Sequence, residues 1–338
     1  MERSIHLTRR RFLASMLGTA GLGTLFVPAW ADTTARNSSG GSAAARIPAD
    51  RIGVQLFTVR DLLSEGMLGL EGTLELLRDV GVSNIELAGD FMGHSPRVLR
   101  ELALQYGVRI VGNHFGPRSM DGENRWYDES GRREIFAEAR GLGLEYVGTG
   151  HYYNVPLTAE GFRQFAQSLN SWGAAASADD LKFYYHNHDG EFTRFDGRPL
   201  FDILLEETDP ELVYFELDMG WTAIAGEDVY EIVRKHQRRF PYFHVKDFKF
   251  DAKGPRETKP NTLASGRRFS FSDIGKGQID WARLFAGLED PSQHVYLIER
   301  DDAGNDEMDE DSSVRPTNPA GSANTIWMSY QYLTHLDF

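Results

Sequence analysis

Eight apolar runs of strand length recur along this 338-residue chain and alternate with stretches whose apolar residues have the spacing of an amphipathic helix. The runs lie at 52–57, 84–88, 108–114, 144–150, 182–187, 212–218, 241–246 and 294–299. The helix-like stretches include 70–80, 96–106, 132–141, 160–176, 228–238 and 322–335. Gly81, Gly107 and Gly143 each follow one of these stretches, as expected at helix C-termini. Eight strand–helix units in one chain predict an α/β fold, a single (β/α)8 TIM barrel, and no GxGxxG follows the first strand to favour an open dinucleotide-binding sheet.

The N-terminus has the pattern of a cleaved twin-arginine signal peptide. TRRRFL at 8–13 precedes a moderately apolar stretch, too short to span a bilayer, which ends in the small-x-small site AWA at 29–31. This pattern predicts export by the twin-arginine translocase and a periplasmic or secreted product without stable membrane anchoring. Three segments are therefore predicted: a signal peptide (1–31), a flexible linker (32–49) and a TIM-barrel catalytic domain (50–338).

Charge and cysteine content exclude several classes of partner and site. The formal net charge is −14, and the predicted leader carries four arginines and one glutamate, so the mature chain is more acidic still. An acidic surface argues against nucleic acid and anionic membranes as partners. Because the chain has no cysteine, it cannot form a disulfide or a thiolate metal site.

Polar, chemically active side chains lie where the predicted strands end, which is where TIM barrels place their active sites. The residues at these strand ends are Glu86, His114, His151, His186, His188, Asp218, His244, Lys246 and Glu299. The two-residue period of a strand puts His186 and His188 on one face, and His244 and Lys246 on one face. Inward-facing polar groups are unfavourable unless they pair or bind a ligand, so this concentration indicates a functional barrel mouth.

Imidazole and carboxylate groups without thiolates predict one bound divalent metal ion. Mn²⁺ is favoured, with Zn²⁺, Co²⁺, Fe²⁺ or Mg²⁺ as alternatives. The predicted ligands are Asp218, His244 and Glu299, together with one ligand from the fifth strand. An open metal position can polarise a carbonyl or hold an enediolate.

Seven segments, in order along almost the whole mature chain, resemble the sugar phosphate isomerase/epimerase superfamily of xylose-isomerase-like TIM barrels, which includes tagatose epimerases, inosose dehydratases and endonuclease IV. The segments are IGVQLFTVRD at 52–61, VSNIELAG at 82–89, YYHNHDGEF at 184–192, ELDMGW at 216–221, HVKD at 244–247, DIGKGQIDW at 273–281 and LIERDD at 297–302. The resemblance implies a divalent metal on Glu, Asp, His and Glu from strands five to eight. Carried over to this chain, Asp218 matches the aspartate, His244 the histidine and Glu299 the last glutamate.

The fifth strand departs from that pattern, because His186-Asn187 stands where many members carry glutamate and asparagine. His186 is the predicted fourth ligand, and Glu191 is the fallback. Ketose epimerases of the superfamily use two metal-bound glutamates, one on each face of the substrate. The YHNHD variant looks more like the inosose dehydratase and keto-sugar lyase branch, where imidazole or lysine can serve as base.

Three functions remain open from the sequence. The first is a secreted, divalent-metal-dependent sugar isomerase or epimerase that abstracts a proton next to a sugar carbonyl through a metal-stabilised enediolate. The second is a lyase or dehydratase that cleaves a 3-keto-sugar, 3-ketoglycoside or inosose by β-elimination, and the third is a non-catalytic periplasmic sugar-binding barrel. His188, Lys246 and Glu299 are the predicted catalytic residues for the first two.

The predicted ligand is a small sugar or keto-sugar without a phosphate, since no Gly-rich loop or basic cluster suggests a phosphate cradle. The predicted substrate contacts are Glu86, His114, His151 and Trp221; for Trp221 taken by itself, core packing is the more common role of such an aromatic. Residues 247–276 are predicted to form a long loop over the mouth, either a lid or a contact in a homo-oligomer.

Overall fold

A computed structural model describes residues 45–64, 67–89, 91–116, 129–150, 155–250, 261–262, 268–304 and 321–338. Three parts of the predictions lie outside these ranges: the signal peptide, residues 32–44 of the linker, and His151. The leader and the domain boundaries therefore remain predictions. No helix within the described ranges is long and apolar enough to cross a membrane.

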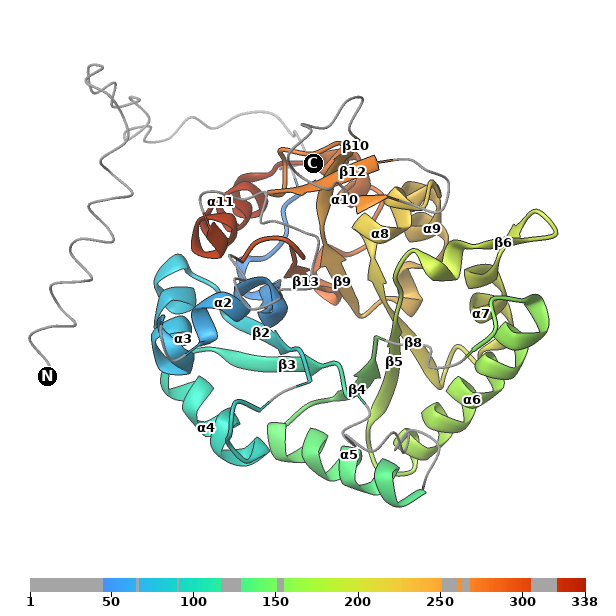
Figure 1. Cartoon of the computed structure of the whole chain (residues 1–338), viewed down its shortest axis with the longest axis horizontal. Helices are drawn as coiled ribbons and strands as arrows, with labels where there is room; N and C mark the ends of the chain where they lie inside the picture. Colours follow the sequence, from blue (N-terminus) through green and yellow to red (C-terminus); the bar gives the residue numbers. More distant parts are fainter. Residues whose placement is uncertain are drawn as a thin grey trace, which may run out of the picture. The chain divides into compact units, whose positions relative to one another are not determined.

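Eight parallel strands form a nearly closed barrel, which confirms the predicted fold class (Figure 1). The strands, each within or close to a predicted run, are β1 (Ile52–Gln55), β2 (Asn84–Leu87), β3 (Arg109–Asn113), β4 (Tyr146–Thr149), β5 (Lys182–His186), β8 (Val213–Asp218), β9 (Tyr242–Val245) and β13 (Val295–Ile298). Their order is β3-β2-β1-β13-β9-β8-β5-β4. Between β3 and β4 a single bridge pairs His114 with Gly148, where the Phe115 N–H donates to the Gly148 carbonyl at 3.0 Å.

Helices pack around the outside of the strands (Figure 1). The predicted ones are α3 (Gly69–Val80), α4 (Pro96–Gln105), α5 (Glu129–Leu142), α6 (Ala159–Ser177), α9 (Val229–His236) and α11 (Gly321–His335). The structure adds α2 (Arg60–Leu63), α7 (Leu200–Glu207), α8 (Met219–Ile224) and α10 (Trp281–Phe285). Gly81 follows α3 in the left-handed conformation, with φ 105°, as its predicted role at a helix end requires.

The alternation of side chains along each strand creates two apolar regions. On β8, Val213, Phe215 and Leu217 belong to the larger core together with helix residues, whereas Glu216 and Asp218 are the alternate residues. A smaller cluster made mostly of tyrosines contains Tyr146, Tyr184, Tyr242 and Leu297. Because the tyrosines lie before the polar residues on their strands, the polar residues sit above an aromatic layer, toward the C-terminal end.

A small antiparallel sheet occupies part of the segment for which a loop was predicted. It consists of β10 (Asp247–Phe250), β12 (Arg268–Ser272) and β11 (Asn261–Thr262). The carboxylate of Asp247 anchors it by accepting hydrogen bonds from the N–H groups of Gly275, Gly277 and Gln278, each at 3.0 Å. A two-stranded ribbon, β6 (Arg194–Phe195) with β7 (Arg198–Pro199), lies between β5 and α7.

Candidate active site

Four polar side chains from four adjacent strands converge at the C-terminal end of the barrel. They are His186, Asp218, His244 and Glu299, all buried, and each offers a nitrogen or oxygen atom within 4.8 Å of the others. Asp218 is the register partner of His244 across β8 and β9. Nδ1 of His244 lies 2.7 Å from Oε2 of Glu299 and 3.9 Å from Oδ2 of Asp218.

This donor set of two imidazoles and two carboxylates fits a divalent ion of the Mn²⁺, Fe²⁺, Co²⁺ or Zn²⁺ type. Burial, reinforced by the charge of His244, holds the pKa of His186 well below its usual value, so His186 keeps a lone pair. Oδ2 of Asp218 is buried and lies 3.0 Å from the Nζ of Lys246. A neutral imidazole and an ionised carboxylate are the forms that metal binding requires.

The charges around the site keep two of the four groups ionised. Burial opposes the charge on Glu299, but Lys246 and His244 outweigh it and hold the pKa of Glu299 well below its usual range. Burial also opposes the charge on His244, yet Glu216 and Glu299 raise the pKa of His244 well above 6.5. The metal-free site therefore holds protons that a bound cation would displace.

Lys246 is a buried cation at the edge of this group. Its Nζ lies 3.0 Å from Asp218 Oδ2, 3.0 Å from Glu299 Oε2 and 2.8 Å from Asp301 Oδ1. Burial alone would lower the pKa of Lys246, but the three carboxylates raise it well above 10.5. Lys246 thus remains an ammonium group, suited to stabilising negative charge rather than to accepting a proton.

Trp221 lies in the first turn of α8, directly after Asp218, whose Oδ1 accepts the Trp221 backbone N–H at 2.7 Å. Its ring meets the rings of Phe269 and Phe271 from the small sheet edge-on, with centroids 5.6 and 5.4 Å away. The Lys246 Nζ lies 5.2 Å from the Trp221 ring centroid. The indole Nε1 is buried and makes no hydrogen bond with the described residues, so Trp221 has an available donor beside the site.

His188 lies two residues beyond β5 and is half-buried. Its ring centroid is 4.8 Å from that of His186 and 6.3 Å from that of Trp221. The structure thus brings His188 next to the four-residue group but not into it, as expected for a residue closer to the substrate.

Glu191, the fallback metal ligand, is buried but is held away from the four-residue group. The Tyr185 hydroxyl donates to its Oε1 at 2.5 Å, and the His188 backbone N–H donates to its Oε2 at 3.0 Å. Burial raises the pKa of Glu191 to about 7, although these hydrogen bonds lower it. Of the two ligand candidates, only His186 belongs to the converging set within the described residues.

Glu86 lies inside the barrel with no exposed surface. Its Oε2 accepts hydrogen bonds from Gln55 Nε2 at 2.8 Å and from His244 Nε2 at 2.7 Å, and its Oε1 accepts one from the Tyr184 hydroxyl at 2.6 Å. Both oxygens are therefore engaged by protein groups, and the side chain has no surface to offer a substrate.

His114 and Glu216 lie beside Glu86. Nε2 of His114 donates to Oε2 of Glu216 at 2.6 Å, and the His114 side chain is 16 % exposed. Nδ1 of His186 and Nε2 of His244 each lie 3.3 Å from the same oxygen, though Nδ1 of His186 has no hydrogen-bond alignment. These four residues form a second converging group, which shares both histidine ligands with the first.

Two carboxylates near the site were not predicted from the sequence. Glu216 lies two residues before Asp218 on one strand, and Asp301 lies two residues after Glu299. For Glu216 the two-residue period of a strand was the available signal, because it puts Glu216 on the same side as Asp218, whereas Asp301 lies in the turn after β13.

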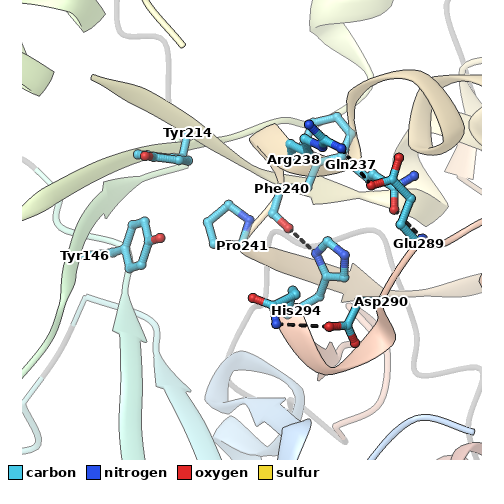
Figure 2. A pocket seen from close by; sticks show the side chains of 10 residues that line it. Tyr146, Tyr214, Gln237, Arg238, Phe240, Pro241, Glu289, Asp290 and His294 are labelled. Atoms are coloured by element: carbon cyan, nitrogen blue, oxygen red, sulfur yellow. Dashed lines mark hydrogen bonds and ion pairs between the residues drawn. The ribbon is translucent and has the colours of Figure 1, made fainter. Parts of the chain in front are cut away.

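The other end of the barrel carries a pocket of about 320 Å³ (Figure 2). Figure 2 shows Tyr146 and Tyr214 on one side and His294 with Asp290 on the other. Tyr146 begins β4, and Pro241 directly precedes β9, so the pocket lies at the N-terminal ends of the strands. That face of a TIM barrel serves stability rather than chemistry, and the pocket is distinct from the candidate active site.

Comparison with known proteins agrees with this architecture. A profile of the family described as xylose isomerase-like TIM barrel matches residues 74–316. An inosose dehydratase of Clostridium perfringens is 31 % identical over 143 residues, which cover 42 % of this chain and 48 % of that protein. The chain thus spans about half the length of the first curated relatives that it matches.

Solved structures share the fold at low sequence identity. A sugar phosphate isomerase/epimerase from Parabacteroides distasonis superposes with a TM-score of 0.62 at 20 % identity, covering 84 % of this chain and 98 % of that one. The IOLI protein, whose crystal structure contains a bound zinc atom, superposes with a TM-score of 0.53 at 14 % identity, covering 83 % and 95 %.

Proposed function

Because the chain belongs to the xylose isomerase-like TIM barrel family, we propose that it is a divalent-metal-dependent enzyme that removes the proton next to the carbonyl of a keto-sugar or inosose and expels the β-substituent. The observation that carries the proposal is the convergence of His186, Asp218, His244 and Glu299 beside the buried cation Lys246. The similarity to inosose dehydratases supports elimination as the reaction class.

The metal requirement is part of the proposal. The two imidazoles and two carboxylates suit Mn²⁺, our first candidate, and also Zn²⁺, Co²⁺ and Fe²⁺. The zinc atom in the IOLI structure supports a metal in this class of barrel. When bound, such an ion would polarise a substrate carbonyl and its neighbouring hydroxyl.

The protein groups around the metal position supply the remaining requirements. His188 is the proposed base, since its imidazole ring lies beside the four-residue group without belonging to it. Lys246 is held as a cation and stabilises the negative charge that develops on the carbonyl oxygen as the proton leaves. The Trp221 indole N–H, which is buried and has no partner among the described residues, is the proposed donor to a substrate hydroxyl.

The fifth strand favours elimination over epimerisation. An epimerase that exchanges a proton between two faces of its substrate needs a base on each face. Here His186 is the proposed ligand on β5, and burial holds its pKa well below the usual value, which makes it a weak base. A β-elimination needs only one base, and a ketone already acidifies the α-proton that this base removes.

Product analysis tests the proposal. The protein is freed of metal, reloaded with Mn²⁺, Zn²⁺ or Co²⁺, and incubated in D₂O with inososes, 3-keto-sugars and 3-ketoglycosides. Elimination gives a product lighter by one water or one alcohol. Deuterium incorporation into the sugar without loss of water or alcohol would instead identify an epimerase or isomerase. Sugar binding with neither deuterium incorporation nor elimination would identify a sugar-binding barrel.

We also propose that the mature protein works in the periplasm or outside the cell, after export by the twin-arginine translocase. The support is the TRRRFL segment with its apolar stretch and AWA site in the sequence. Free sugar phosphates are scarce in that compartment, so a neutral keto-sugar suits both the location and the acidic site. An assembly of several copies remains a prediction.

A further inference from the structure

We infer that Glu86 is a positioning residue for the ligand His244 and does not contact the substrate. In this role Glu86 fixes the Nε2–H of His244 toward the barrel interior and thereby presents Nδ1 to the metal position. The inference rests on the proposed function, which supplies the divalent metal ion that His244 would bind.

The hydrogen bonds around Glu86 fix its orientation. The Gln55 Oε1 accepts the Phe57 backbone N–H at 3.0 Å, so the other end of that amide, the Nε2 group, points to Glu86. An amide nitrogen only donates, which makes Oε2 of Glu86 an acceptor. The His244 Nε2 lies 2.7 Å from the same oxygen, and we infer that it carries a proton and donates it there.

The opposite ring nitrogen of His244 faces the proposed metal ligands. Its Nδ1 lies 2.7 Å from Glu299 Oε2 and 3.9 Å from Asp218 Oδ2, within the four-residue group. A neutral imidazole carries one proton, so a proton fixed on Nε2 leaves the Nδ1 lone pair for a metal. Carboxylates that accept from the distal nitrogen of a ligating histidine orient the ring and raise its basicity.

Two strand glycines create the space that this network occupies. A Cβ on Gly112 of β3 would lie 2.6 Å from Oε1 of Glu86, and a Cβ on Gly148 of β4 would lie 2.1 Å from the Tyr184 ring. Glycine weakens the interior of a strand, and it often marks a place where another group must approach the backbone closely. Both glycines thus indicate that the strands are built around the Glu86–Tyr184 pair.

The second converging group, formed by His114, His186, Glu216 and His244, does not act as an additional metal position. Both groups use His186 and His244, so each of these rings would have to serve two ions at once. Filling both positions would also require His244 to give up both ring protons.

Co²⁺ binding and ring-proton exchange test the inference. Glu86→Ala should weaken Co²⁺ binding by about 10- to 100-fold, the usual effect of losing such a partner. Glu86→Gln should restore most of the affinity, because its amide oxygen can accept from both His244 and Gln55. Tyr184→Phe is the matched control: it removes a hydrogen bond to the same carboxylate on the side away from His244, and should lose much less affinity.

The decisive readout is the Nε2 proton of His244, followed by ¹H–¹⁵N NMR in the metal-free protein. This proton should exchange slowly with D₂O in the wild type, in Tyr184→Phe and in Glu86→Gln, and rapidly in Glu86→Ala. A wild-type His244 with rapid exchange, or Glu86→Ala with unchanged Co²⁺ affinity, overturns the inference. The exchange measurements on the wild type, Tyr184→Phe and Glu86→Gln need neither metal nor a folded Ala variant. A wild type that fails to bind Co²⁺ therefore contradicts the proposed function separately from the inference.

Discussion

Replacing Lys246 by methionine gives the sharpest test of the proposed site. The substitution keeps most of the side-chain volume and removes the charge that three carboxylates surround, with Asp218, Glu299 and Asp301 at 2.8–3.0 Å. We expect lower stability, retained metal binding and a loss of turnover of at least about a hundredfold, the scale for a group that stabilises developing charge.

The stability change can be worked from the geometry. Each ion pair at about 3 Å contributes roughly 5 kcal/mol at an effective dielectric constant of 20, and much of this offsets the desolvation of Lys246. Removing one partner of a buried pair costs about 3–5 kcal/mol, because the other charge stays buried and uncompensated. For a chain of this size each kcal/mol corresponds to roughly 2 °C, so the metal-free melting temperature should fall by about 6–10 °C.

A bound divalent ion should restore part of this loss. The ion would neutralise Asp218 and Glu299, two of the three carboxylates that Lys246 contacts. Metal addition should therefore raise the melting temperature of Lys246→Met by more than that of the wild type. The pKa of Lys246 is raised in the folded protein, so its stabilisation is complete below the unfolded value near 10.4 and fades only at higher pH. Removing Lys246 also takes away a charge that lowers the pKa of Asp301, which is about 7 in the wild type, so the stability difference between variant and wild type should grow as the pH rises above about 7.

Lys182→Met is the matched control. Lys182 also starts from a strand and pairs with one carboxylate, that of Glu145 at 2.7 Å, but its side chain is 46 % exposed. An exposed pair contributes about 0–1 kcal/mol, so this variant should melt within about 2 °C of the wild type and keep full turnover. The reasoning fails if Lys246→Met is as stable and as active as Lys182→Met, with metal content measured by mass spectrometry in both.

Three other perturbations test the pH response, the metal and the leader. Burial raises the pKa of Glu191 to about 7, so the folded protein binds a proton there and the stability of the wild type should fall between about pH 4.5 and 7. In urea unfolding, Glu191→Gln should match the wild type near pH 5 and exceed it by roughly 3 kcal/mol above pH 8. Parallel curves of stability against pH for the two proteins would refute this. Asp218→Ala or His244→Ala should abolish tight binding of one divalent ion per chain, and full occupancy by mass spectrometry would remove that residue from the site. Lys in place of both Arg9 and Arg10 should leave precursor in the cytoplasm on immunoblots of cell fractions, whereas normal periplasmic amounts would contradict twin-arginine export.

The eight barrel strands were predictable because each is a short, nearly continuous apolar run bounded by turn signals. Helices of ten or more residues, such as α6, were equally visible from their periodicity. The four-residue helix α2 and the five-residue helix α10 were not, because one turn is too short to show a period of 3.6. The small sheet of β10 and β12 was missed as well, since its order depends on Asp247 accepting N–H groups from residues some 30 positions away.

The sequence predicted which strand ends carry the site, but it did not predict how deeply each side chain is buried in the barrel. The sequence places Glu86 at the end of its strand, where a substrate contact was expected. The structure instead surrounds it with Gln55, Tyr184 and His244, contacts across the barrel that no local pattern encodes. Glu216 was overlooked for the converse reason, because it lies within β8 rather than at its end.

The charges inside the barrel explain why a metal centre without cysteine can be stable here. Lys246 pairs with three carboxylates at the mouth, Asp218, Glu299 and the partly exposed Asp301, and two more buried carboxylates, Glu86 and Glu216, lie near the histidines. Buried carboxylates of this number are unfavourable unless cations or protons compensate them. In the metal-free protein the compensation falls partly on His244, whose pKa the neighbouring carboxylates raise despite burial, and partly on Asp301, whose pKa burial raises to about 7. A divalent ion at the mouth would supply two positive charges where these protons now sit. The same carboxylate excess that would attract the ion would make its binding release protons, so that metal occupancy and the protonation of the mouth would be one linked equilibrium.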